Sequence, residues 1–123
     1  MATILVIDDD EAVRRLILRI LKPTMHTLLE AQDGNAAIAM LKKHDADLII
    51  TDLVMPKKEG IATMREIHER TPGTKVIAIS GGGTSRNMAF LDVARAMGAD
   101  ATLAKPFSPR DLLEAVERLL PTG

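Results

Sequence analysis

The chain of 123 residues contains no cysteine, tryptophan or tyrosine, and only two phenylalanines. The lack of cysteine excludes disulfides, zinc–thiolate sites and cysteine nucleophiles, and it fits a reducing compartment. With so few aromatic rings, the stacking platforms that bind single-stranded nucleic acid are missing. A formal net charge of -1 gives no general attraction to nucleic acid or to anionic membranes. We therefore expect no direct binding of nucleic acid.

Long apolar runs are also missing, and none approaches the length of a membrane-spanning helix. The N-terminus has neither a basic segment nor a small-residue cleavage site, so a secretory signal is not expected. These features favour a soluble, cytoplasmic protein that does not associate with membranes. The length suits one ordinary hydrophobic core, so we expect residues 1–123 to form a single domain.

Short apolar runs alternate with longer amphipathic segments along the chain. The apolar runs predict strands over 4–7, 27–31, 48–50, 76–79 and 101–104. Apolar residues at helical spacing predict helices over 13–21, 34–41, 61–67, 90–97 and 108–120. Gly98 is the expected C-terminal cap of the fourth helix, and Ser108 with Asp111 predicts a capping box for the last one.

The order of these elements predicts an α/β fold. Strands that alternate with helices pair in parallel through right-handed crossovers. Continuous apolar runs, rather than alternating ones, indicate strands that are buried on both faces. The expected architecture is an open α/β sandwich of about five strands with helices on both sides. The site of such a sheet lies at the carboxyl ends of its strands.

Polar residues follow four of the predicted strands, at Asp8–Asp10, Asp52, Ser80 and Lys105. Clustered carboxylates repel one another unless a cation neutralises them, and Mg²⁺ suits a few carboxylates plus waters. One carboxylate can then attack phosphorus, while the metal, a lysine and a hydroxyl offset the charge of the phosphoryl group. Each residue alone has an ordinary structural explanation, and Asp10 is expected to cap the next helix. The combination, in this order, predicts phosphoryl transfer to a carboxylate.

The segments ILVIDDD, TDLVMP, AISG and LAKPF resemble the receiver domain of two-component response regulators, over essentially the whole chain. The resemblance implies a chemotaxis-regulator-like, flavodoxin-like (βα)5 sandwich with a parallel sheet of order 2-1-3-4-5. It implies that Asp52 is the phosphoacceptor, and that Ser80 and Lys105 contact the phosphoryl group. The implied Mg²⁺ ligands are Asp8, Asp9, Asp52 and the backbone carbonyl of Val54. It also implies a cis bond between Lys105 and Pro106.

The same resemblance implies a signalling role rather than turnover of other substrates. A histidine kinase or a histidine phosphotransfer protein would donate the phosphoryl group, and the domain would hydrolyse it slowly. The output would pass through the loop after the fourth strand and the face of the fourth helix, fifth strand and fifth helix. The domain would be a monomer or a phosphorylation-dependent dimer, with an unknown output target or effector domain. Arg14, Arg15 and Arg19 suit either a contact with the donor or a solvated helix face.

One position departs from the family pattern. The family usually carries Tyr or Phe three residues before the lysine, and this chain has Thr102. An aromatic side-chain flip therefore cannot occur there. The loop that begins Gly81-Gly82-Gly83 is permissive and costly to order, so we expect Ser80, Gly81 and Thr102 to form the switch.

Two alternative functions share some of these sequence features. A haloacid-dehalogenase-type phosphatase also uses a strand-end aspartate, Mg²⁺, a hydroxyl and a lysine, and Asp8 and Asp10 fit its Asp-x-Asp start. However, Ala12 stands where that family has Thr or Val, and the chain is short for a substrate-selecting cap. The other alternative is an interaction module that works without phosphorylation. Retained partner binding after Asp52→Ala would support that alternative.

Overall fold

The computed structural model describes residues 2–52, 57–80 and 98–120, with only the backbone for 57–63 and Ser80. The strands are β1 (Thr3–Ile7), β2 (Thr27–Ala31), β3 (Leu48–Asp52), β4 (Lys75–Ser80) and β5 (Ala101–Ala104). The helices are α1 (Glu11–Leu21), the short 3₁₀ helix η1 (Lys22–Thr24), α2 (Gly34–Lys43), α3 (Lys57–Arg70) and α5 (Pro109–Leu119). The predicted fourth helix, over 90–97, lies outside the described residues.

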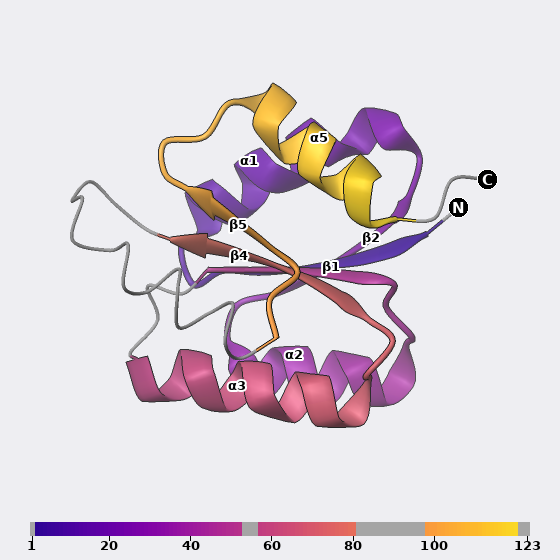
Figure 1. Cartoon of the computed structure of the whole chain (residues 1–123), viewed down its shortest axis with the longest axis vertical. Coiled ribbons are helices and arrows are strands. Elements are labelled where there is room, and N and C mark those ends of the chain that lie inside the picture. The colour runs from indigo at the N-terminus through magenta and orange to yellow at the C-terminus, as the bar shows by residue number, and fades with distance from the viewer. Residues whose placement is uncertain (1, 53–56, 81–97, 121–123) are drawn as a thin grey trace.

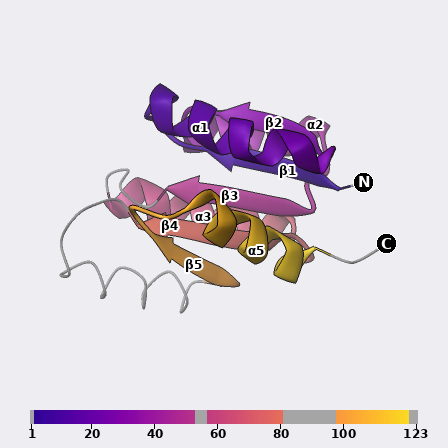
Figure 2. The same ribbon diagram turned by 90° about the horizontal axis from the view of Figure 1, so that it is seen from above.

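The five strands form one sheet in the order β2-β1-β3-β4-β5, and every neighbouring pair is parallel. This confirms the predicted fold class and strand order. Because the strands run in one direction, their carboxyl ends lie together at one edge, seen in Figure 2 as the side to which the arrows point. We call this the carboxyl edge and the opposite one the amino edge. Among the described residues, no helix is long and apolar enough to cross a membrane.

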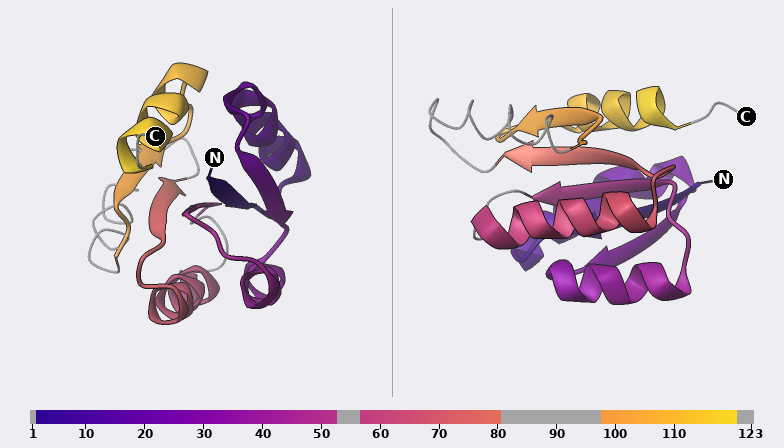
Figure 3. Two further views of the ribbon diagram at one scale, coloured as in Figure 1. Left: turned by 90° about the vertical axis from the view of Figure 1, so that its right-hand side faces the viewer. Right: turned by 60° about the horizontal axis from the view of Figure 1, so that its bottom comes forward.

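Helices cover both faces of the sheet, with α1 and α5 on one side and α2 and α3 on the other (Figures 1 and 3). Successive side chains of β1 point to opposite faces of the sheet, so the strand contributes to the core on both sides. Ile4 and Val6 pack in the cluster under α1 and α5, whereas Leu5 and Ile7 pack in the cluster under α2 and α3. All four are buried, as the continuous apolar run predicts. The sheet is thereby fixed between two cores.

Polar side chains fix the starts of three helices. Asp10 caps α1, because its Oδ1 accepts the backbone N–H groups of Ala12 and Val13 at 2.9 and 3.4 Å. Asp33 caps α2 in the same way. The predicted capping box of Ser108 and Asp111 is present at the start of α5. These caps supply partners for amides that a helix leaves unpaired in its first turn.

Gly98 has a φ of 105°, in the left-handed region that favours glycine. A Cβ built there would come within 3.2 Å of the His68 Nδ1 on α3. The glycine therefore allows both a backbone conformation and a close approach that a larger residue would strain. Its predicted role as a helix cap concerns a helix outside the described residues.

Candidate functional site

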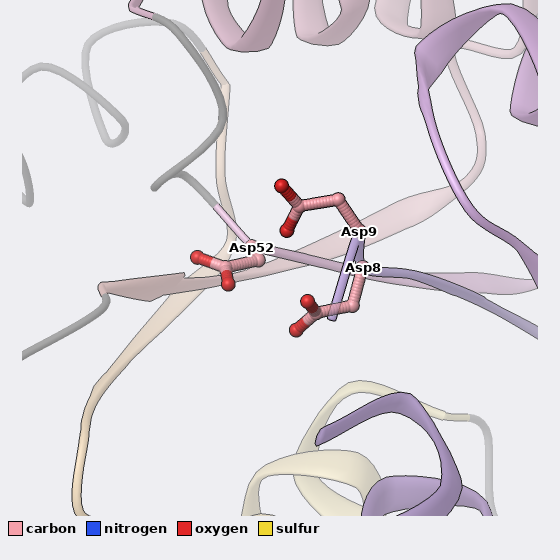
Figure 4. Close-up of side chains that lie close together, drawn as sticks. All are labelled: Asp8, Asp9 and Asp52. Atoms are coloured by element: carbon pink, nitrogen blue, oxygen red, sulfur yellow. The ribbon is translucent and has the colours of Figure 1, made fainter. Parts of the chain in front are cut away.

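Three aspartates meet at the carboxyl edge, where β1 and β3 lie side by side. Asp8 and Asp9 follow β1 directly, and Asp52 is the last residue of β3. One carboxylate oxygen from each lies within 4.8 Å of the others. Figure 4 shows Asp8 and Asp9 leaving the end of β1 on opposite sides, with their carboxylates turned toward Asp52. The predicted acidic cluster is therefore assembled by the parallel pairing of two neighbouring strands.

Asp8 is held by its neighbours from several directions. Its backbone N–H donates to the carbonyl of Ala31 at 3.2 Å, and its Oδ1 accepts the backbone N–H of Asp10 at 2.8 Å. The side chain is 0% exposed, and among the described residues its Oδ2 has no hydrogen-bond partner. A buried carboxylate oxygen without a hydrogen-bond donor is unfavourable, so a cation would be a suitable partner for this atom.

Lys105, which directly follows β5, places a positive charge beside the two buried aspartates Asp8 and Asp52. The Lys105 Nζ donates a hydrogen bond to the Asp52 Oδ2 at 3.0 Å and lies 3.9 Å from the Asp8 Oδ2. The Asp52 side chain is only 3% exposed, so little water screens this ion pair. The bond between Lys105 and Pro106 is cis, as the family resemblance implies.

Burial raises the pKa of the Asp8 carboxyl from 3.8 to about 6, and the adjacent Asp52 carboxylate adds to the rise. The hydrogen bond from the Asp10 amide and the charge of Lys105 lower the same pKa but do not cancel the effect of burial. Negative charge at Asp8 is therefore under-compensated by the protein alone. A cation beside Asp8 would supply the missing compensation.

The donor set fits a hard divalent cation. It consists of carboxylate oxygens from Asp8, Asp9 and Asp52, and oxygen is the ligand that Mg²⁺ and Ca²⁺ take. The exposed position of Asp9 leaves room for water on one side, and Mg²⁺ usually keeps several waters. The orphaned Asp8 oxygen is the observation that most directly supports a cation here.

The structure describes only some of the other predicted site residues. Ser80 ends β4 opposite Ala104 in the register of β5, but its side chain lies outside the description. Thr102 lies in β5 opposite Ala78. Val54 and Gly81 fall outside the described residues, so the carbonyl ligand and the switch remain predictions.

Asp10 does not belong to the acidic cluster. Its carboxylate caps α1, as the sequence analysis predicts. A haloacid-dehalogenase-type site would need both Asp8 and Asp10 to face the substrate. The position of Asp10 therefore disfavours that alternative.

Sequence reasoning missed a contact made by Arg14. The sequence suits a solvated helix face or a contact with the donor at this position, yet the Arg14 side chain is only 13% exposed. Its Nη1 donates to the backbone carbonyl of Asp8 at 2.8 Å. One signal was available in the sequence, because a side chain one turn into a helix points back toward the loop that precedes it.

Comparisons with known proteins agree with this geometry. The family model described as response regulator receiver domain matches residues 4–117. The chain is 33% identical over 117 residues to the chemotaxis protein CheY of Halobacterium salinarum, covering 95% of each protein. It is 37% identical to the transcriptional regulatory protein ResD of Bacillus subtilis, but covers only 47% of that protein.

Solved structures show the same likeness. A CheY-like receiver domain protein from Methanospirillum hungatei superposes with a TM-score of 0.83 at 30% identity, with 96% of this chain and 92% of that one covered. The chemotaxis protein CheY4 of Vibrio cholerae gives a TM-score of 0.84 at 27% identity, with 98% and 99% covered. The likeness thus extends across the whole described sheet and its helices.

Proposed function

Because this chain belongs to the response regulator receiver family of two-component signalling, we propose that it accepts a phosphoryl group on Asp52. The observation that carries the proposal is the position of Asp52, whose Oδ2 receives a hydrogen bond from Lys105 at 3.0 Å beside the orphaned oxygen of Asp8. A receiver modifies itself and is not a conventional enzyme acting on other substrates. The acidic cluster can hold a metal, and we propose Mg²⁺ as that metal.

The chemistry follows from the residues at the carboxyl edge. An oxygen of the Asp52 carboxylate attacks phosphorus, and the bond between phosphorus and the donor nitrogen breaks as the new P–O bond forms. The ammonium of Lys105, freed from its pairing with Asp52, offsets negative charge on the phosphoryl oxygens. The Ser80 hydroxyl donates a hydrogen bond to another oxygen.

The proposed metal ligands are Asp8, Asp9, Asp52 and the backbone carbonyl of Val54. Bound there, Mg²⁺ would neutralise charge on the carboxylates and on the phosphoryl group. Asp8 and Asp9 orient the site and supply most of its negative charge. Water would later release phosphate from Asp52 and reset the domain.

Membership of the family implies a kinase partner. We propose that the donor is a histidine kinase or a histidine phosphotransfer protein. The signal would leave through Ser80, Gly81 and Thr102 toward the face of the fourth helix, β5 and α5, in a monomer or a phosphorylation-dependent dimer. We also propose that residues 1–123 form a single receiver domain. The cytoplasmic location stays a prediction.

The test is to incubate the protein with Mg²⁺ and acetyl phosphate and to record intact mass. Wild type should gain one phosphoryl group only when Mg²⁺ is present, and Asp52→Asn should gain none. Asp45→Asn, at an exposed aspartate in the loop before β3, is the matched control and should react as wild type does.

A donor-independent arm uses beryllofluoride, which mimics the bound phosphoryl group, with binding followed by NMR of backbone amides. If wild type shows neither an adduct nor beryllofluoride binding, the receiver mechanism is wrong. The phosphorylation-independent interaction module would then take its place.

A further inference from the structure

Arg14 connects the loop after β1, which carries the proposed metal ligands Asp8 and Asp9, to the neighbouring strand β2. Its Nη1 donates to the Asp8 carbonyl at 2.8 Å, and its Nε donates to the Glu30 Oε1 at 2.7 Å. The Arg14 side chain is 13% exposed and that of Glu30 is 52% exposed. One guanidinium therefore connects α1, the loop after β1 and the edge strand β2.

The helix geometry explains why Arg14 reaches the loop. Asp10 caps α1, and the Arg14 backbone N–H donates to the Asp10 carbonyl at 2.9 Å. Side chains on a helix lean toward its N-terminus, so Arg14 is directed at the residues before the cap. A planar guanidinium presents several donors in a fixed fork and can hold two acceptors at once. A lysine in its place has a single ammonium on a flexible stem.

The Asp8 carbonyl oxygen, which accepts a hydrogen bond from Arg14, belongs to the peptide that links Asp8 to Asp9. The Asp8 amide and Oδ1 are already fixed by Ala31 and Asp10, so the carbonyl contact sets the remaining orientation of this segment. Within the described part of the chain, the Asp9 carboxylate has no hydrogen bond that would orient it separately. The placement of the Asp9 carboxylate therefore depends in part on how the Asp8–Asp9 peptide is held.

We propose that Arg14 is a positioning residue for the cation site and that Glu30 orients Arg14. By locking the peptide between two metal ligands, the pair keeps both carboxylates directed at one cation before it arrives. Pre-orientation of this kind strengthens metal binding, because the loop does not have to be ordered by the metal. The proposal rests on the cation site of the proposed function and adds residues that touch neither the metal nor the phosphoryl group.

Electrostatic attraction alone predicts the opposite change in Mg²⁺ affinity. Removing a positive guanidinium near an acidic cluster should strengthen cation binding, whereas removing a positioning contact should weaken it. Arg15 provides the matched control, because it lies on the same helix, is 73% exposed and pairs with Glu11 rather than with the loop. Arg15→Ala thus removes the same charge from α1 without touching Asp8.

The experiment compares wild type with Arg14→Ala, Arg14→Lys and Arg15→Ala. Mg²⁺ affinity is measured by isothermal titration calorimetry, because the chain has no Trp or Tyr to report binding by fluorescence. Arg14→Ala should raise the Mg²⁺ Kd by about tenfold, and Arg14→Lys should recover only part of this loss. Arg15→Ala should bind Mg²⁺ at least as tightly as wild type.

A second readout needs no metal. Hydrogen exchange of the Asp10 amide, which donates to the Asp8 Oδ1, should be faster in Arg14→Ala than in Arg15→Ala without Mg²⁺. Equal Kd values and equal exchange rates in these two variants would overturn the proposal. If wild type binds no Mg²⁺, the proposed function fails, and the exchange rates alone decide whether Arg14 orders the loop.

Far-UV circular dichroism establishes that each variant is folded. If Arg14→Ala is not, Glu30→Gln tests the same contact from the exposed side, and its Mg²⁺ Kd should rise by a smaller factor. Glu66→Gln is its control, because Glu66 forms a similar exposed ion pair with Arg70 on α3. A Glu30→Gln variant that matches Glu66→Gln in both readouts would overturn the role of Glu30.

Discussion

The two edges of the sheet use aspartates in opposite ways. At the amino edge, the Asp47 Oδ2 accepts the Thr3 backbone N–H at 2.8 Å, and the Asp100 Oδ2 accepts the backbone N–H of Val76 at 2.9 Å. These carboxylates extend the ladder of the sheet beyond the strands. At the carboxyl edge, Asp8 and Asp52 face each other and Lys105 instead.

The difference shows how one residue type serves structure at one edge and chemistry at the other. A carboxylate whose oxygens accept backbone amides stabilises the fold. A carboxylate that is buried beside another one is held at a cost, which a cation can later offset. Asp8 also accepts a backbone amide, from Asp10, but only with its Oδ1. Its Oδ2 has no hydrogen-bond partner within the described residues and lies 3.9 Å from the Lys105 Nζ, so the surroundings of each oxygen, rather than residue identity, separate the two roles. Substitutions at matched positions of the two edges test this distinction.

The largest effect is expected at the lysine of the carboxyl edge. Lys105→Ala removes the ammonium that offsets phosphoryl charge, and should slow adduct formation with acetyl phosphate about 100-fold. Lys75→Ala, at an exposed lysine that begins β4 on the amino edge, should react within about twofold of wild type, because a screened distant charge contributes little. Initial rates come from intact mass over time. Equal rates for the two variants would remove Lys105 from the mechanism.

The next largest effects are on the free energy of unfolding. One substitution at each edge of the sheet should change it in opposite directions. At pH 7 without Mg²⁺, Asp8→Asn should raise the free energy of unfolding by about 1–3 kcal/mol, because it removes a buried, under-compensated charge. Asp47→Ala should lower the free energy of unfolding by about 1 kcal/mol, because the amide of Thr3 loses its acceptor. Urea unfolding followed by circular dichroism measures both.

The pH dependence of the free energy of unfolding of the wild-type protein tests independently whether the ionised Asp8 carboxylate destabilises the fold. Since the pKa of this carboxyl rises from 3.8 to about 6 on folding, the native state binds the proton more tightly than the unfolded chain between these values. The contribution of Asp8 to the free energy of unfolding therefore falls as pH rises through this window, by up to about 3 kcal/mol. Saturating Mg²⁺ at pH 7 should reverse this loss. If wild type and Asp8→Asn show the same pH profile, Asp8 is not the group responsible.

The smallest effect concerns backbone strain near the amino edge. Met25 follows η1 with a φ of 67° and is 73% exposed. A non-glycine residue in this region costs about 1–2 kcal/mol, and the extra freedom of glycine in the unfolded chain offsets part of any gain. Met25→Gly should therefore stabilise the protein by about 0.5 kcal/mol, measured by urea unfolding. Met25→Ala keeps the strain and should give no gain; equal stabilities of the two variants would contradict this account.

Much of the fold could be predicted because its signals are local. Apolar runs marked the strands, and Asp10 and Ser108 marked the starts of helices through their own backbone contacts. The boundaries were less certain, since β1 begins at Thr3 and β4 at Lys75, where polar residues continue the ladder. The first helix ends at Leu21, as predicted, and a 3₁₀ turn over Lys22–Thr24 follows it, which periodicity did not indicate.

The acidic cluster could be predicted because parallel strands bring their carboxyl ends together, and the family resemblance supplied the strand order. The bond from Arg14 to the Asp8 carbonyl could not, since it depends on how α1 is rotated over the sheet. Nor could the sequence tell that the Asp8 Oδ2 is buried without a hydrogen bond. Periodicity assigns a residue to a face of an element, but it does not state which atoms of distant elements meet.

The layer formed by α1 and α5 has a consequence for biosynthesis. Its core joins Ile4 and Val6, from the first strand, to Leu112 and Val116, from the last helix. While the chain emerges from the ribosome, α1 can cover only part of this face of β1, and the rest stays exposed until α5 has been made. Apolar surface exposed during synthesis favours aggregation and chaperone binding. β1 is thus made well before the last of its core partners, the helix α5.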